Sequence, residues 1–297
     1  MELKYKNLKK GFPGALQLVL MMLSLLILFS SVSFSDTSIL IVRGNGAAFE
    51  DVVKGLSEEL NQAVSSKELV LDKMSTSKIF EDNIKELKPK LLILMDNKAI
   101  VFNRKYQETL VSPNTAIPSI SLMGILVEEE IKSLRNATGI LYEIPIVTPV
   151  VSLRNIIKKP IQKVGVIHRN FMDKFIRDNE KYLLREKIDL VPFLIAEKEA
   201  NLQEAIEKGL TFLFEKQKID VLWVPNDNRL LKLDLINIAW KPLIKKYQKP
   251  VIVGVEILVN PALDFGTYAV LPDHVAMGKQ LAEIIYDLKD NNWQYTE

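Results

Sequence analysis

Short apolar runs alternate with longer amphipathic segments along most of the chain. The runs SILIVRG (38–44) and KLLILMDN (90–97) have the length and the β-branched content of strands. Between such runs, segments such as FEDVVKGLSEELNQAV (49–64) place apolar side chains three or four positions apart, which predicts helices. Nearly continuous apolar strands separated by helices are typical of βαβ units, in which helices cover both faces of a parallel sheet.

The alternation occurs twice, so the sequence predicts an α/β fold with two lobes. The first run has predicted strands at 38–44, 69–74, 90–97 and 116–124 and helices at 49–64, 78–88 and 127–135. The second has predicted strands at 161–170, 188–195, 220–228 and 250–257 and helices at 171–186, 199–217, 230–248 and 276–289. The proline-containing stretch LYEIPIVTPVVS (141–152) separates the two runs, and NNWQYTE (291–297) is a tail.

The first 35 residues have the layout of a secretory signal peptide. A basic start, MELKYKNLKK, precedes the apolar ALQLVLMMLSLLILFSSVSF (15–34), and Ser33-Phe34-Ser35 gives a small-x-small cleavage pattern before Asp36. The alternative is an uncleaved anchor, since about 20 apolar residues span a bilayer. Both interpretations place the remaining domain outside the cytoplasm, in the periplasm or its equivalent.

Composition excludes several classes of function. The chain has 39 basic and 37 acidic residues, and the small basic excess lies in the predicted signal peptide. Nucleic-acid binding requires a concentrated positive field, which the rest of the chain lacks. With no cysteine and only two histidines, we expect no lipid-linked cysteine, no disulfide, no metal site and no cofactor.

Polar side chains follow the predicted strands at their carboxyl ends, where ligands bind in open parallel sheets. These candidate ligand-binding residues are Arg43, Asn45, Asp96, Asn97, Ser121, His168, Arg169, Asn226, Asp227, Asn228 and Glu256. Any one of these residues could be polar simply because the end of a strand is exposed to water. Together they predict a rim that holds a small polar molecule.

The sequence contains no catalytic constellation, and we expect no enzyme. There is no G-x-S-x-G nucleophile motif. His168 suits a general base by its place at a strand end, but the sequence fixes no carboxylate beside it, so it also suits a pocket wall. His274 follows Asp273, a natural helix N-cap, and we interpret both as structural.

Three segments resemble bacterial ABC-transporter substrate-binding proteins of the periplasmic-binding-protein type I fold, a group that includes aromatic amino-acid binders. They are RNATGILYEIPIVTPVVSLRNIIKKPIQKVGVIHR, IDVLWVPNDNRLL and KPVIVGVEILVNPALDFGTYAVLPDHVAMGKQLAEIIYDL. In the third, Gly266 and Gly278 fall on the glycines of the family pattern. The resemblance covers roughly residues 38–290 and rests on the order and spacing of the motifs.

The resemblance implies two Rossmann-like lobes joined by crossing strands, with the ligand between them. The first lobe takes 36–146 and 268–290, and the second takes 147–267. Asp227 and Asn228 fall on the family's "DN" pair at the cleft, and Arg43 and Asn45 fall in its first-strand loop.

The first lobe departs from the family in two places. Met95-Asp96-Asn97-Lys98-Ala99 stands where the family has a GT-x-A loop, and Ser121-Leu122-Met123-Gly124 replaces a small polar strand end. Both segments face the ligand in the family, so the ligand class stays open.

The leading hypothesis is an exported, monomeric solute-binding protein that delivers a small ligand to the transmembrane permease of an ABC transporter. Asp227, Asp96 and Glu256 suit an ammonium group, whereas Arg43 and Arg169 suit a carboxylate, which favours an amino-acid-like ligand. One alternative is a tethered or periplasmic sensor or partner-binding domain on the same fold. The other is an exported α/β enzyme that uses His168 and Asp227 as an acid–base pair.

Overall fold

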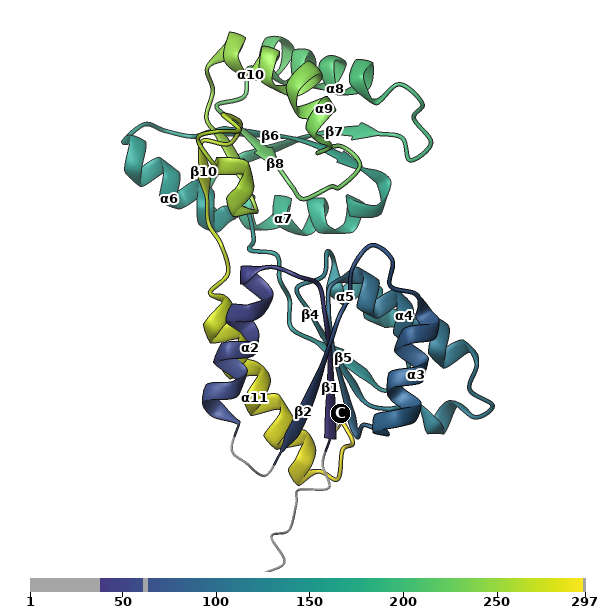
Figure 1. The fold of residues 1–297 in the computed structure, drawn as a ribbon. Coiled ribbons are helices and arrows are strands. Elements are labelled where there is room, and N and C mark those ends of the chain that lie inside the picture. Colours follow the sequence, from purple (N-terminus) through teal and green to yellow (C-terminus); the bar gives the residue numbers. More distant parts are fainter. Residues whose placement is uncertain (1–37, 61–63, 296–297) are drawn as a thin grey trace, which may run out of the picture.

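The computed structural model describes residues 38–60 and 64–295, and these form two lobes, one above the other in Figure 1. Each lobe has one five-stranded sheet, with strand order β2-β1-β3-β4-β5 in the first and β10-β9-β8-β6-β7 in the second. All strand pairs are parallel. The predicted α/β fold with two parallel sheets is confirmed.

The first lobe is a three-layer sandwich. Its strands are β1 (Ser38–Arg43), β2 (Ser65–Val70), β3 (Leu91–Met95), β4 (Ser119–Leu122) and β5 (Ala137–Gly139). Its helices are α2 (Ala47–Glu59), α3 (Ser77–Leu87), α4 (Asn97–Glu108), α5 (Val127–Glu130) and α11 (His274–Asp290), with 3-10 turns at Pro113–Thr115 and Ile131–Ser133.

Alternation along β1 explains the layers of the first lobe. Ile39 and Ile41 are buried in the cluster that contains α2 and α11, whereas Leu40 and Val42 are buried in the cluster that contains α3 and α4. Figure 1 shows these two helix pairs on opposite sides of the sheet. Successive side chains point to opposite faces of a strand, so a continuous apolar run serves two cores.

The second lobe has the same layering. Its strands are β6 (Lys163–Arg169), β7 (Asp189–Ile195), β8 (Val221–Val224), β9 (Val251–Val253) and β10 (Tyr268–Ala269). Its helices are α6 (Val147–Ile157), α7 (Asp173–Arg185), α8 (Leu202–Thr211), α9 (Leu233–Leu235) and α10 (Lys241–Tyr247), with π-helical turns at Phe212–Lys216 and Ile236–Trp240 and 3-10 turns at Asn170–Met172 and Glu256–Val259. Helices α6 and α7 cover the face toward the first lobe (Figure 1).

Helices α4 and α6 were not predicted from the sequence. The inner face of α4 buries Asn103 and Gln107 among its apolar residues, which interrupts the apolar period. In α6, Pro149 lies in the first turn, where a backbone N–H has no partner within the helix, so the proline is tolerated. Strand β2 covers Ser65–Val70 rather than the predicted 69–74. This edge strand is largely exposed, so no apolar pattern marks where it begins.

The chain crosses between the lobes twice, through residues 140–146 and 270–273, on either side of α6–β10. Strand β10 pairs with β9 in the second sheet, so the return crossing follows Tyr268 and Ala269 rather than preceding them. The division at 146/147 and 267/268 otherwise stays a prediction. The predicted signal peptide or anchor (1–35) lies outside the described residues, and within the described ranges no helix is long and apolar enough to cross a membrane.

Candidate functional site

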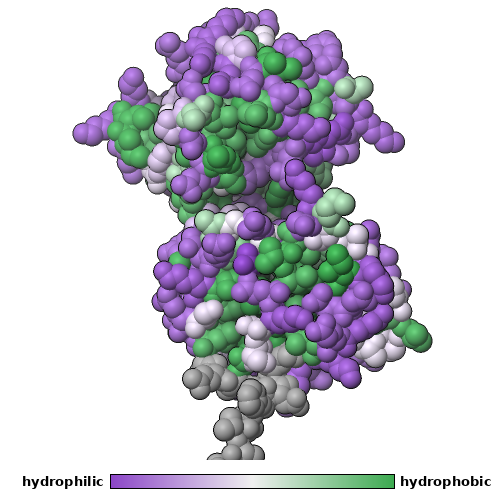
Figure 2. Space-filling view, viewed as in Figure 1, coloured by the Kyte–Doolittle hydropathy of each residue, from purple (hydrophilic) through white to green (hydrophobic). Residues whose placement is uncertain are grey.

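The carboxyl ends of strands from both sheets and the two crossings surround an opening between the lobes. The molecular surface is hollowed at this level (Figure 2). Two adjoining hollows lie here. We name the one beside the crossings the central pocket and the more open one the outer cleft.

The central pocket has about 560 Å³ of empty space, part of it open to solvent, and an apolar wall. The first crossing contributes Tyr142, Glu143, Ile144 and Ile146, and the return crossing contributes Val270 and Pro272. The second lobe supplies the aromatic side chains of Phe175 and Trp223, whose ring centroids are 5.7 Å apart. Such a wall suits a ligand with an apolar body.

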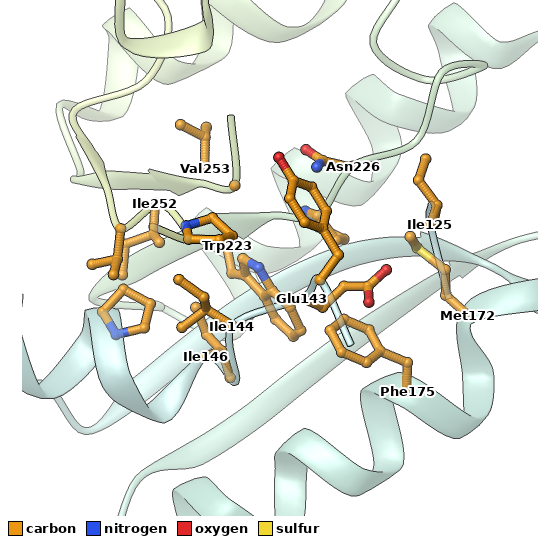
Figure 3. A pocket seen from close by; sticks show the side chains of 16 residues that line it. Ile125, Glu143, Ile144, Ile146, Met172, Phe175, Trp223, Asn226, Ile252 and Val253 are labelled. Carbon is orange, nitrogen blue, oxygen red and sulfur yellow. The ribbon is translucent and has the colours of Figure 1, made fainter. Parts of the chain in front are cut away.

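Few polar groups enter the central pocket, and each has a definite environment. The Glu143 carboxyl accepts a hydrogen bond from the backbone N–H of Leu126 at 2.5 Å, and burial raises its pKa. The Tyr142 hydroxyl lies 3.1 Å from Nε2 of His274, which ties the first crossing to the start of α11. Figure 3 shows Glu143 extending between Trp223 and Phe175 toward Met172, with Asn226 at the far side of the pocket.

Asn226 is the residue of the predicted rim that lines the central pocket. Its Oδ1 atom is buried and has no hydrogen-bond partner among the described residues. Gly254 faces it: a Cβ atom there would lie 3.4 Å from Asn226 Oδ1, which is ordinary van der Waals contact. An unpaired buried oxygen beside an apolar hollow is a ready acceptor for a ligand donor.

The outer cleft is larger, with about 1150 Å³ of empty space that includes open solvent. Asn97 from the first lobe and Arg169 and Asn228 from the second line it. Asn97 is bonded to its own lobe, because its Nδ2 donates to the Ile125 carbonyl at 2.9 Å and its Oδ1 accepts from the Ile125 N–H at 2.6 Å. Asn228 is exposed.

Asp227 is bonded on both carboxylate oxygens by its own chain. Arg169 donates to it from Nε at 2.7 Å and from a terminal guanidinium nitrogen at 2.8 Å, and the N–H groups of Arg229 and Leu230 donate to Oδ1. Asp227 is 2% exposed. Arg169 pairs on its other side with Glu197, so this group is a closed ion-pair network in the second lobe.

The first-lobe members of the predicted rim lie apart from the central pocket. Arg43 forms an ion pair with Glu68 of β2 at 2.5 Å, and Asn45 is exposed. Asp96 caps α4 by accepting from the Ala99 N–H at 2.9 Å, and burial raises its pKa. Ser121 is buried within β4, with its hydroxyl unpaired among the residues that the structure describes.

The remaining second-lobe members also lie elsewhere. His168 lines a separate hollow beside β7, with its Nδ1 3.4 Å from Asp173 Oδ1, and burial lowers its pKa. Glu256 is exposed at the start of its 3-10 turn. Of the predicted rim, the structure therefore brings Asn97, Arg169 and Asn228 to the outer cleft and Asn226 to the central pocket.

No protein-family model matches the chain, and no curated protein matches it. Solved structures do. The ligand-free, open structure of CD0873, a substrate-binding protein with adhesive properties from Clostridium difficile, aligns with a TM-score of 0.59 at 15% identity over 86% of this chain and 85% of that one. The chain has the type I periplasmic-binding-protein fold.

Two further structures with this fold come from proteins with different ligands. The arabinose-binding protein AraP from Geobacillus stearothermophilus aligns with a TM-score of 0.56 at 14% identity, covering 86% of this chain and 88% of that one. An ABC domain in complex with L-Trp from Streptococcus pneumoniae aligns with a TM-score of 0.52 at 13% identity, covering 86% and 85%. The same fold thus occurs with a sugar-binding and an amino-acid-bound protein.

The type I fold explains which pocket residues the sequence patterns missed. Tyr142 and Glu143 lie on a crossing, which the patterns treated as a separator between lobes. A single acidic residue in the apolar stretch LYEIPIV was the available signal. Phe175 and Trp223 match core spacing, and Trp223 is indeed 5% exposed, but their rings also line the pocket.

Proposed function

We propose that the chain is an exported solute-binding protein that holds one small solute in the central pocket and delivers it to an ABC permease. The observation that carries this proposal is the apolar pocket between the lobes, built from both crossings and from strand ends of the second sheet. An apolar hollow with a few convergent polar groups is the usual form of a small-molecule site.

The arrangement of the wall favours capture by closure. A solute in contact with Ile125 of the first lobe and with Phe175 and Trp223 of the second would bind more tightly as the lobes approach. A ligand shifts a conformational equilibrium by the difference in its affinity for the two states. The neighbouring structures support a transported solute as cargo, since they are binding proteins and an ABC domain.

The enzyme alternative was based on His168 and Asp227 as an acid–base pair, and each of these side chains has other partners. Asp227 is bonded to Arg169, Arg229 and Leu230, while His168 lies 3.4 Å from Asp173 in a different hollow. The alternative of a tethered or periplasmic sensor stays open, and export and a monomeric state likewise stay predictions.

A thermal-shift screen of the purified full chain tests the proposal. We expect a subset of small solutes with an apolar body to raise the melting temperature. Phe175→Ala removes a ring from the pocket wall and should weaken such a solute about tenfold or more, because a buried aromatic contact contributes on the order of 2 kcal/mol.

Tyr182→Ala is the matched control, because Tyr182 lies on the same helix, is 40% exposed and does not line the central pocket. It should leave the affinity unchanged. The proposal fails if no solute in a broad panel of sugars, amino acids, amines and aromatic acids raises the melting temperature.

A further inference from the structure

The polar atoms that line the central pocket are mainly hydrogen-bond acceptors. The acceptors are the Glu143 carboxyl, the buried Asn226 Oδ1 and the Tyr142 hydroxyl, the last already engaged with His274. The amide nitrogen of Asn226 is a neutral donor at the same residue. Within the described part of the chain, neither lysine nor arginine lines this pocket. A carboxylate buried there would have no positive partner, and leaving a buried charge unpaired is costly.

The cations that line the neighbouring hollows are already paired. Arg169 is bonded to Asp227, and Arg104 of α4 forms an ion pair with Glu130 at 2.6 Å. Lys174 of α7 lies between three carboxylates, at 3.4 Å from Glu128, 3.4 Å from Glu129 and 3.2 Å from Asp178. Recruiting any of them for an anionic ligand would break an existing pair.

The Glu143 carboxyl has no cationic side chain as a partner among the described residues that line the central pocket. Its pKa is raised by burial, with backbone N–H groups as its stabilising contacts. On the side away from the central pocket it borders a hollow shared with Glu128, Glu129, Lys174 and Asp178, where the lysine is already paired. A cation placed in the central pocket would supply the missing positive partner.

The aromatic wall adds attraction for a cation. Tyr142, Phe175 and Trp223 line the same pocket, and ring faces attract ammonium groups, most strongly when water is excluded. Figure 3 shows Glu143 beside Trp223 and Phe175, so a charge that meets the carboxyl group lies against aromatic carbon.

We propose that the central pocket selects apolar primary amines, which carry an ammonium group and lack a carboxylate. The ammonium donates to Glu143, and the apolar body fills the space between the aromatic and isoleucine side chains. This inference rests on the proposed function and narrows its ligand class, away from the amino-acid-like ligand that the sequence favoured.

Isothermal titration calorimetry of the full chain with paired probes tests the selection. The pairs are tryptamine with L-tryptophan, phenethylamine with L-phenylalanine, and isopentylamine with L-leucine, which differ by one carboxylate. At least one amine should bind about tenfold or more tightly than its amino acid, because the amino acid also buries a carboxylate that has no positive partner in the pocket.

Glu143→Gln should weaken the amine by a similar factor while keeping an amide oxygen for the Leu126 N–H, so the fold is preserved. Tryptophol, the uncharged counterpart of tryptamine, should bind the variant as it binds the parent chain. Glu128→Gln removes a carboxylate that borders the neighbouring hollow but not the central pocket, and should leave amine affinity unchanged.

The inference is overturned if no amine binds more tightly than its amino acid, if Glu143→Gln leaves amine affinity unchanged, or if none of the three amines binds. In each case the broad solute panel separates the two proposals. Another solute that binds the central pocket leaves the proposed function standing, whereas a panel without any binder overturns both.

Discussion

Asp227 holds the loop after β8 by bonding to Arg169, Arg229 and Leu230 in the interior of the second lobe. The strand-end pattern correctly placed a polar group here. It could not tell a ligand-gripping carboxylate from one that is neutralised by the chain, because the partner Arg169 is 58 positions away. The charge pairing is a property of the tertiary structure.

Asp227→Ala should therefore destabilise the protein. The substitution leaves the Arg169 guanidinium, whose side chain is 11% exposed, without its buried partner. Breaking such a pair costs about 3–5 kcal/mol. Urea unfolding followed by circular dichroism measures the loss, and the exposed neighbour Asn228→Ala should change the midpoint little. An unaltered midpoint for Asp227→Ala, with solute binding abolished, would return Asp227 to the ligand-gripping role.

The buried Glu143 carboxyl makes stability depend on pH. Burial raises its pKa above the ordinary value of 4.5, so the folded chain holds this proton more tightly than the unfolded chain does. At pH values between about 4.5 and the pKa of Glu143 in the folded chain, the unfolded chain binds fewer protons than the folded chain. The free energy of unfolding therefore falls as pH rises through this range. Above that pKa the loss is complete.

Glu143→Gln should remove this contribution. Without solute, the variant should gain stability relative to the parent chain as pH rises through the window, as measured by urea unfolding at a series of pH values. Asp96 has a pKa raised by burial as well and is unchanged in both proteins, so the difference between the two curves isolates Glu143. Parallel curves would contradict the assignment.

At the scale of elements, α2 and α11 pack at backbone distance through two glycines. A Cβ atom at Gly278 would lie 2.1 Å from the Val52 carbonyl oxygen, and one at Gly55 would lie 2.1 Å from the Val275 carbonyl oxygen. Gly278 is also one of the glycines on which the sequence resemblance rests. The structure thus gives a physical reason for a glycine at this position, since neither contact admits a side chain.

Gly278→Ala should separate the two helices and destabilise the first lobe by about 1–3 kcal/mol or more, the usual cost of overpacking. Thermal unfolding measures the effect. Glu283→Ala on the exposed side of α11 is the control and should change stability by less than about 0.5 kcal/mol. If Gly278→Ala matches this control, the close packing of α2 on α11 is not needed.

Most strands and helices could be predicted because apolar periodicity reports burial directly. The apolar residues of β1, β3, β6, β8 and β9 are buried, and each of these strands was predicted. The apolar pattern failed where polar side chains are buried and where a strand is exposed. Helix α4 buries Asn103 and Gln107, and the edge strand β2 exposes nearly all its side chains.

At the scale of the whole molecule, the candidate site could be predicted only in part. The prediction that the site lies at the carboxyl ends of parallel strands included Asn226, which lines the central pocket. The crossing residues Tyr142 and Glu143 carry no strand-end signal, since a crossing becomes a pocket wall only after two lobes fold around it. Phe175 and Trp223 serve the core and the pocket together, so spacing alone assigns them to the core.

The central claim is that the two lobes capture a solute in the pocket between them. Small-angle X-ray scattering of the full chain, with and without a saturating solute from the thermal-shift screen, tests it most directly. The radius of gyration should fall on binding, as the lobes close over Glu143, Asn226 and the aromatic side chains. An unchanged radius of gyration at saturation, verified by calorimetry on the same sample, would contradict capture between the lobes.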